Sequence, residues 1–364
     1  MIGERRATVL LVMILCSLLV SLQNISAVKA AEDYWTTLKP MPTSRAGIGV
    51  AVVDGKIYAI GGSYDSLGET EEYDPATNTW TKKTPMPTPR MWIGIAVVEN
   101  KIYTIGGDGG NWEVGITPTN VNEVYDPATD TWETLTPMPT KRMALTANVV
   151  DGKIYVIGGG QRAPNTNFGV NEVYDPETNT WTTKTSLPTG VEHHTSAVVD
   201  NKIYVMGGAV EVTLNQIYDT ETDTWSSGAP LPKGVDAAAA VVTSGVYAPK
   251  RIHVIGGKQN LDAVKFNQIY DPETDTWSTG TPMPTARYGL GVAIIDDVLY
   301  AIGGREGWVG FPVSAANERY TPADYIPEFP SLTPLLITLV VVVAIIMIYR
   351  SKLNKKSQGD FDVI

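Results

Sequence analysis

Six Gly-Gly pairs recur along the chain about every fifty residues, and this repeat constrains the fold more than any other feature of the sequence. The pairs stand at residues 61–62, 106–107, 158–159, 207–208, 256–257 and 303–304. Each pair ends an apolar segment such as KIYAIGG, whose β-branched and aromatic residues predict a strand. A repeat of this length indicates six copies of one supersecondary unit that stack against their neighbours.

A tyrosine follows each glycine pair, and in five units a tryptophan stands seven residues after it. The tyrosines are Tyr73, Tyr125, Tyr174, Tyr218, Tyr270 and Tyr320, and the tryptophans are Trp80, Trp132, Trp181, Trp225 and Trp277. The sixth unit has Pro327 instead, but Trp35 lies 26 residues before the next glycine pair, as four of the five tryptophans do. We therefore expect the strand around Trp35 to complete the sixth unit and close a ring, which removes two exposed sheet edges.

The strands are mostly apolar, which predicts sheets that are buried on both faces between neighbouring units. Asp54-Gly55 separates two such strands and predicts a tight hairpin turn, because both residues tolerate a positive φ. The expected equivalents are Asn100-Lys101, Asp151-Gly152, Asp200-Asn201 and Asp296-Asp297. The paired glycines leave room for a neighbouring backbone and the tryptophans fill the wedge between units, so both are expected to be structural.

Together these motifs resemble the Kelch family across residues 33–322, nearly the whole central part of the chain. The resemblance implies an all-β fold, a six-bladed β-propeller over residues 31–322 that is closed by its amino-terminal strand. It also implies that one mouth of the ring is the place where a peptide or another ligand binds.

The first thirty residues have the pattern of a secretory signal peptide. A basic start with Arg5 and Arg6 precedes an apolar run over residues 7–22, and Val28-Lys29-Ala30 forms a small-residue exit. We expect cleavage after Ala30, and an uncleaved membrane anchor is the alternative.

Residues 332–349 contain no charge and are followed by Arg350, Lys352, Lys355 and Lys356. At about 1.5 Å per residue, this segment is long enough for a transmembrane helix. The basic cluster predicts a cytoplasmic tail over residues 350–364 and hence an extracytoplasmic propeller on a single-pass cell-membrane protein. Pro327-Glu328-Phe329, in the Pro-rich spacer over residues 323–331, resembles archaeal Pro-Glu-Phe sorting signals; a permanent anchor is the alternative.

Charge and cysteine content exclude several function classes. The whole chain has 39 acidic and 28 basic residues, of which residues 1–30 and 332–364 contain three acidic and seven basic ones. The central part therefore has 36 acidic and 21 basic residues, a net charge of −15. So acidic a domain repels phosphate backbones, which argues against a nucleic-acid partner.

The single cysteine of the chain, Cys16, lies in the predicted signal peptide. The domain therefore has no disulfide or thiolate site, and we expect no cofactor or metal.

One loop in each unit varies in length, and this variation predicts the position of a binding site. The distance from the second glycine of a pair to the repeated tyrosine of the same unit varies from 10 to 18 residues, so the loop between the second and third strands absorbs most of the variation. In an antiparallel four-stranded blade this loop shares a face with the connection between units. We call this face the mouth, and we expect binding there because its loops are free of packing constraints.

The candidate binding residues at the mouth fall into three groups. Four units repeat an arginine in motifs such as PMPTSR, and two loops carry a tryptophan, while other positions are not repeated. The candidates are Arg45, Arg90, Trp92, Trp112, Arg142, Glu192, His193, Asp236, Arg287, Tyr288 and Trp308. The repeated arginine can equally well have a structural role, in which it bonds to the backbone of a neighbouring blade. The non-repeated residues are therefore the better candidates for ligand specificity.

Three functions are consistent with this pattern. The leading hypothesis is a surface-displayed binding or adhesion module for a protein or glycan, with no catalytic residue. The first alternative is an extracytoplasmic sugar epimerase or isomerase that uses Glu192 and an arginine, and the second is a structural surface-layer component. A metal pair at His193 and His194 is improbable because adjacent residues of a strand point to opposite faces. The sequence leaves the ligand and the oligomeric state open.

Overall fold

The computed structural model describes residues 33–63, 67–111, 113–161, 166–209, 212–307 and 312–325. The chain divides into two units, Met1–Tyr325 and Ile326–Ile364, and all described residues belong to the first. These residues form strands and turns without any helix, so none of them belongs to a helix that could cross a bilayer. The predicted signal peptide, transmembrane helix and cytoplasmic tail lie outside the described residues.

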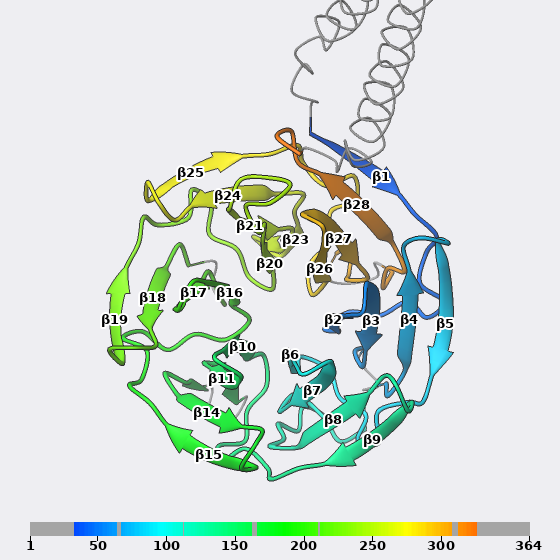
Figure 1. The fold of residues 1–364 in the computed structure, drawn as a ribbon, viewed down its shortest axis with the longest axis vertical. Helices are drawn as coiled ribbons and strands as arrows, with labels where there is room; N and C mark the ends of the chain where they lie inside the picture. Colours follow the sequence, from blue (N-terminus) through cyan, green and yellow to red (C-terminus); the bar gives the residue numbers. More distant parts are fainter. Residues whose placement is uncertain are drawn as a thin grey trace, which may run out of the picture. The chain divides into compact units, whose positions relative to one another are not determined.

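The described residues form six four-stranded antiparallel sheets arranged around one axis, as expected for a propeller (Figure 1). Blade 1 contains β2 (Gly49–Val53), β3 (Lys56–Ile60), β4 (Thr70–Asp74) and β5 (Thr79–Lys83). Blade 2 contains β6 (Gly94–Val98), β7 (Lys101–Ile105), β8 (Asn122–Asp126) and β9 (Thr131–Thr134). Blade 3 contains β10 (Thr146–Val150), β11 (Lys153–Ile157), β14 (Asn171–Asp175) and β15 (Thr180–Thr183).

The remaining blades repeat the same order of strands. Blade 4 contains β16 (Thr195–Val199), β17 (Lys202–Met206), β18 (Asn215–Asp219) and β19 (Thr224–Ser227). Blade 5 contains β20 (Ala239–Val242), β21 (Ile252–Ile255), β24 (Asn267–Asp271) and β25 (Thr276–Thr279). Blade 6 contains β26 (Gly291–Ile295), β27 (Val298–Ile302), β28 (Asn317–Thr321) and β1 (Tyr34–Thr37). Two loop hairpins add β12 (Gly160–Gln161) with β13 (Thr166–Asn167), and β22 (Lys258–Gln259) with β23 (Asp262–Ala263).

The amino-terminal strand closes the ring, which confirms the expectation from the position of Trp35. β1 pairs antiparallel with β28, and Trp35 lies opposite Tyr320 with their ring centroids 5.1 Å apart. Every other blade has the same pair of rings, as Tyr73 and Trp80 show with centroids 5.0 Å apart. Figure 1 shows β1 as the outermost strand of a sheet whose other three strands come from the end of the propeller.

Neighbouring blades are joined by two hydrogen bonds that recur around the ring. The indole nitrogen of Trp132 donates to the carbonyl oxygen of Thr84 at 2.9 Å, and the carboxylate of Asp130 accepts from the amide of Thr84 at 2.9 Å. The same carboxylate accepts from the hydroxyl of Tyr125 at 2.6 Å. The tryptophans therefore hold adjacent blades together, in agreement with their predicted structural role.

The glycine pairs also bring neighbouring blades together. The amide of Gly304 donates to the carbonyl oxygen of Arg45 at 2.8 Å, and a Cβ added to Gly303 would lie 2.7 Å from that same oxygen. Gly303 has a φ of +63°, which only glycine adopts without strain. The close approach of backbones requires glycine, as the sequence predicts.

The inner hairpin turns follow the prediction except in blade 2, and no turn was predicted for blade 5. In blade 2 the turn residues are Glu99 and Asn100, one position earlier than expected. In blade 5 residues 243–251 replace the short turn, which accounts for the longer spacing after Trp225. Asp297 of blade 6 holds this insertion because its carboxylate accepts hydrogen bonds from the amides of Ser244, Tyr247 and Ala248 at 2.5–3.0 Å.

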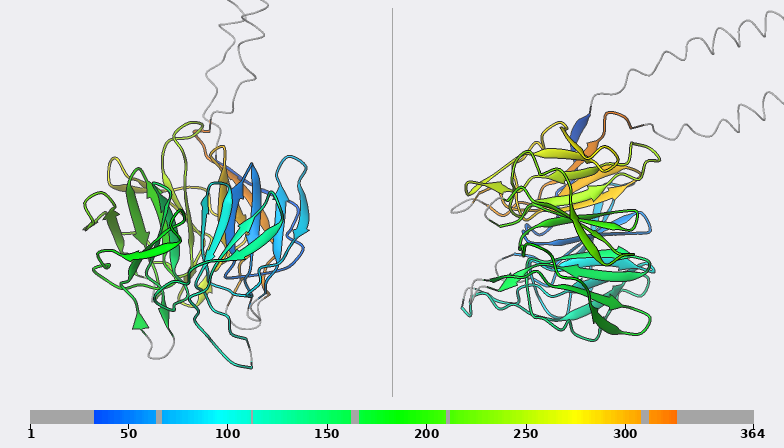
Figure 2. Two further views of the ribbon diagram at one scale, coloured as in Figure 1. Left: turned by 60° about the horizontal axis from the view of Figure 1, so that its bottom comes forward. Right: turned by 90° about the vertical axis from the view of Figure 1, so that its left-hand side faces the viewer.

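The pairing of β27 with β28 shows on which face of the propeller the last described strand ends. Leu299 at the start of β27 lies opposite Tyr320 near the end of β28. The end of β28 therefore lies at the edge of the sheet that carries the turn Asp296–Asp297, away from Gly303. The described chain leaves the propeller on the face opposite the mouth, whose loops are seen from the side in Figure 2.

Candidate functional site

The four repeated arginines lie beneath the mouth and are bonded to their own blades. Each is fully buried, with an exposed fraction of 0%. In blade 2 the guanidinium of Arg90 pairs with Glu123 at 2.7 Å and donates to the carbonyl oxygen of Gly106 at 2.5 Å. Burial disfavours the charged guanidinium and lowers the pKa of Arg90, and the charge of Glu123 opposes this shift. Arg45, Arg142 and Arg287 form the equivalent pairs with Glu71, Glu172 and Glu318.

The two blades without this arginine also lack its acid. Blades 4 and 5 have Val191 and Val235 at the arginine position, and Gln216 and Gln268 in place of the glutamate. The side chain of Gln216 accepts from the amide of Thr189 at 2.9 Å and donates to the carbonyl oxygen of Thr189 at 3.0 Å. At this position an arginine is present only where a buried carboxylate needs a partner, so all four arginines build the scaffold. They do so by bonds within their own blades and not, as the alternative expected, to the backbone of a neighbouring blade.

Two residues after each arginine position, the backbone forms a closed circle around the axis. The amide of each residue donates to the carbonyl oxygen of the equivalent residue in the preceding blade at 2.7–3.0 Å. All six residues have φ between +52° and +63°. They are Gly47, Trp92, Ala144, His193, Ala237 and Gly289. This circle, which we call the backbone ring, fixes six neighbouring side-chain positions at the centre of the mouth.

Trp92 covers part of the backbone ring. A Cβ on Gly47 would lie 3.0 Å from the indole, and a Cβ on Gly289 would lie 2.7 Å from it. Glycine at these two positions therefore makes room for the indole to lie across the ring. The imidazole of His193 meets Trp92 edge to face, with ring centroids 4.7 Å apart. Below them, a second cavity of about 250 Å³ follows the axis between the innermost strands.

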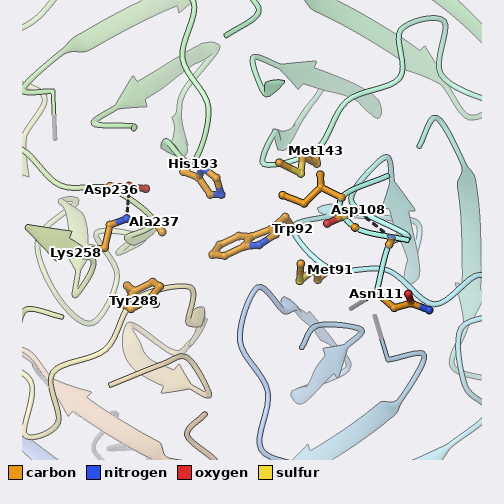
Figure 3. A pocket seen from close by; sticks show the side chains of 13 residues that line it. Met91, Trp92, Asp108, Asn111, Met143, His193, Asp236, Ala237, Lys258 and Tyr288 are labelled. Carbon is orange, nitrogen blue, oxygen red and sulfur yellow. Dashed lines mark hydrogen bonds and ion pairs between the residues drawn. The ribbon is translucent and has the colours of Figure 1, made fainter. Parts of the chain in front are cut away.

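Above Trp92 lies a pocket of about 370 Å³ that opens at the mouth. Figure 3 shows Trp92 at its centre, with Met91 and Met143 on one side and Tyr288 on the other. These side chains come from different blades, since β6, β10 and β26 follow Met91, Met143 and Tyr288 respectively. The loop residue Ile116 extends the apolar wall of blade 2. Rigid blades thus hold an apolar pocket in place.

Polar and charged groups line the pocket from several blades: Asp108 and Asn111 from blade 2, His193 from blade 4, and Asp236 and Lys258 from blade 5. Asp236 and Lys258 form an ion pair at 2.9 Å with little exposure, and the Lys258 ammonium lies 5.7 Å from the ring centre of Tyr288. Burial raises the pKa of Glu192, and the negative charge of Asp236 raises it further. Burial lowers the pKa of His193, so its imidazole is neutral near pH 7.

The structure brings together several of the predicted site residues and separates others. Trp92, His193, Asp236 and Tyr288 line the same pocket, and Glu192 lies beside Asp236 closely enough for their charges to interact. The four arginines are fully buried and do not line it. Trp112 and Trp308 lie outside the described residues.

Sequence reasoning missed Met91, Met143, Asp108 and Lys258, which also line the pocket. Met91 and Met143 follow Arg90 and Arg142, at the position that Glu192, Asp236 and Tyr288 occupy in other blades. Asp108 and Lys258 follow a Gly-Gly pair directly. Comparing these two positions across all six units would have identified them. The described residues contain no group of three His, Cys, Asp or Glu side chains that could hold a metal ion.

These features define a six-bladed β-propeller whose repeated residues build the scaffold and whose non-repeated residues line a pocket at one mouth. A family model described as the KLHDC2/KLHL20/DRC7 Kelch-repeats domain matches residues 108–304, and one described as the Kelch motif matches residues 44–87. The chain belongs to the Kelch-repeat family.

Similar proteins share only parts of this chain or its fold. Kelch-like protein 25 of Rattus norvegicus is 35% identical over 81 residues, which cover 20% of this chain and 14% of that protein. Kelch-like protein 1 of Mus musculus is 43% identical over 42 residues, which cover 12% of this chain and 6% of that protein. A solved structure titled "Structure of YjhT" covers 77% of this chain and 95% of its own, with a TM-score of 0.67 and 17% identity, and so shows the fold alone.

Proposed function

We propose that this protein is a membrane-anchored binding module that displays its propeller outside the cell and holds a protein partner at the mouth. The observation that carries the proposal is the pocket above Trp92. Its walls come from positions whose residue varies among the blades, whereas the buried arginines, tyrosines and glycine pairs repeat. Scaffold duties explain the repeated residues but not Met91, Met143 or Tyr288. Kelch propellers are generally protein-binding scaffolds.

Two exposed aliphatic side chains support a protein rather than a glycan as the ligand. Val114 is 68% exposed and Leu261 is 58% exposed, and both lie on mouth loops that contribute residues to the pocket. Glycan sites need many hydrogen-bonding groups, whereas this pocket has mainly apolar walls. A partner that covered Val114 and Leu261 would bury apolar surface around the pocket.

Display outside the cell rests on the sequence pattern of the two ends. Residues 1–30 and 332–349 would direct secretion and span the membrane, respectively, which places residues 350–364 in the cytoplasm. The described chain leaves the propeller on the face opposite the mouth, so the pocket would point away from the membrane. An epitope tag at Thr117 would then be accessible to antibody on intact cells. Access to a tag at Asp130 alone would contradict this orientation.

Site-specific photocrosslinking in intact cells tests the binding proposal. A photoreactive residue replaces Val114 or Leu261, and the control replaces Val246, which is 72% exposed in the blade 5 insertion on the opposite face. We expect a discrete protein adduct from the two mouth positions and none of that size from Val246. Trp92→Ala should abolish the adduct while the thermal unfolding transition remains cooperative.

Two results would contradict this function. One is an adduct of the same size from Val246, and the other is an adduct that persists unchanged in Trp92→Ala. A glycan array probed with the full-length chain checks the other ligand class: binding to a glycan that Trp92→Ala abolishes, without any protein adduct, would replace the protein partner by a glycan.

A further inference from the structure

Acidic side chains differ in how they are paired at the pocket above Trp92. Asp108 and Asp236 line the pocket, and Glu192 lies next to it, close enough to Asp236 for their charges to interact. Glu192 and Asp236 occupy equivalent positions in the connections that enter blades 4 and 5. Asp236 is neutralised by Lys258 at 2.9 Å. The carboxylate of Glu192 makes no hydrogen bond or ion pair with any other residue that the structure describes. The mouth therefore presents one partly buried carboxylate without a counter-charge on this side of the pocket.

The lysine nearest to these acids is already engaged. The Lys258 ammonium contacts Asp236 and also lies 5.7 Å from the ring centre of Tyr288. Lys258 compensates the charge of Asp236, so among the described residues Glu192 is the acid on this side that no basic side chain pairs with. Burial and, to a smaller extent, the nearby charge of Asp236 raise the pKa of Glu192. A positive group brought by a ligand would relieve this repulsion and pair with Glu192.

The opposite side of the pocket is lined by two methionines together with Asp108 and Asn111. The Asp108 carboxylate already accepts hydrogen bonds from the amides of Gly110 and Thr117 at 2.9 and 2.6 Å. Met91 and Met143 are each 6% exposed and face the indole of Trp92. Methionine side chains are flexible and polarisable, so they adapt to different apolar shapes and pack well against aromatic rings. A volume of about 370 Å³ is near the lower end of the range for ligand pockets, which suits a side chain or two of a partner.

We infer that the occupant is a segment of a partner protein in which a bulky apolar side chain neighbours a lysine or arginine. The apolar side chain packs against Met91, Met143 and Trp92, and the basic side chain pairs with Glu192. This inference rests on the proposed function and specifies its partner. It follows from the apolar surface that Met91, Met143 and Trp92 provide in the pocket and from the neighbouring carboxylate of Glu192, which has no counter-charge among the described residues.

Selection from a phage-displayed library of random peptides tests the inference, with the full-length protein in detergent micelles as the target. We expect the selected peptides to carry a large apolar residue within two positions of lysine or arginine. In each synthetic peptide, lysine or arginine is then replaced by glutamine. The wild-type protein should bind the glutamine peptide about fivefold more weakly, as expected for a partly screened ion pair.

A double-mutant cycle assigns that preference to Glu192. In Glu192→Gln the basic and glutamine peptides should bind equally, whereas the control Glu177→Gln, at an exposed turn of blade 3, should keep the fivefold preference. Raising the salt concentration should reduce the wild-type preference because the pair is only partly buried.

The two proposals fail in different ways. If the selected peptides lack a basic residue, or if Glu192→Gln keeps the preference for it, the present inference is wrong. Binding that still depends on Trp92 would then leave the proposed function standing. If no peptide is enriched, or if Trp92→Ala binds the peptides as well as the wild type does, both proposals are wrong.

Discussion

The carboxylate of Asp33 accepts a hydrogen bond from the hydroxyl of Tyr320 at 2.7 Å, across 287 residues of sequence. It also accepts from the amide and the hydroxyl of Thr281, at 2.5 and 2.8 Å. Asp275 of blade 5 makes the equivalent contacts, with the hydroxyl of Tyr270 in its own blade and with the amide of Ala229 at the end of blade 4, both at 2.6 Å. In blade 6, Asp33 from the amino-terminal end of the propeller therefore takes the place of the turn residue that accepts these hydrogen bonds in the other blades.

Replacing Asp33 tests whether this contact stabilises the closed ring. Asp33→Ala should lower the free energy of unfolding by about 2–3 kcal/mol, because three hydrogen bonds to the carboxylate are lost. Asp33→Asn should change it by less than about 1 kcal/mol, since asparagine fills this position in blades 1 and 3 as Asn78 and Asn179. Urea titration followed by tryptophan fluorescence measures both. Equal effects of the two substitutions would show that the acceptor oxygen is not what matters.

Gly303→Ala tests the close approach between blades 6 and 1. The new Cβ would lie 2.7 Å from the carbonyl oxygen of Arg45, so the blades would have to move apart, and we expect a loss of about 3 kcal/mol or more. Gly55→Ala is the matched control because its φ is +70° but no atom lies within 4 Å of its Cβ. Backbone strain alone should cost about 1 kcal/mol there. Similar losses for both variants would rule out the inter-blade contact as the cause.

The Arg90–Glu123 pair predicts a rescue between two substitutions. Arg90→Val leaves the Glu123 carboxylate buried without a counter-charge and should cost about 3–5 kcal/mol. Adding Glu123→Gln reproduces the combination found in blades 4 and 5 and should recover most of that loss. Thermal and urea unfolding of the three variants measure the coupling. If the double variant is no more stable than Arg90→Val, another cause explains why blades 4 and 5 lack both the arginine and the glutamate.

His253 makes the stability of the propeller depend on pH. It replaces the tyrosine of the other five KIYAIGG-like strands, and burial is the main cause that lowers its pKa to about 4. As the pH falls below the ordinary histidine value, the unfolded chain binds the proton first, so the free energy of unfolding falls until the pH reaches the pKa in the fold. Between pH 7 and 5 this one residue should account for a loss of about 2 kcal/mol.

His253→Tyr restores the side chain of the other blades and should remove that part of the pH dependence. Unfolding in urea at pH 7 and pH 5 compares the two proteins, and His194, whose pKa is lowered by burial to about 3, contributes equally to both. An unchanged difference between the two pH values in His253→Tyr would show that His253 does not titrate as its burial requires.

The number of blades and the closure of the ring could be predicted because each depends on residues that repeat at fixed spacing. A tyrosine, a tryptophan and two glycines make the same local contacts in every unit, and Trp35 keeps the register that Trp80 has. The turn in blade 2 was misplaced by one residue, because Glu99-Asn100 and Asn100-Lys101 differ little in their tolerance of positive φ. The mouth was located correctly as a face from the antiparallel order of strands, but its lining was predicted only in part.

The repeated residues were enough to predict the fold, because they encode contacts within one blade and between adjacent blades. The residues at the mouth that can meet a ligand are known only from the assembled ring, because burial depends on side chains from several blades at once. Arg90 and Met91 are neighbours in the chain, yet Glu123 and the backbone around Gly106 enclose the arginine while the methionine lines the pocket. The backbone ring that places Trp92 beside His193 likewise exists only when all six blades are assembled.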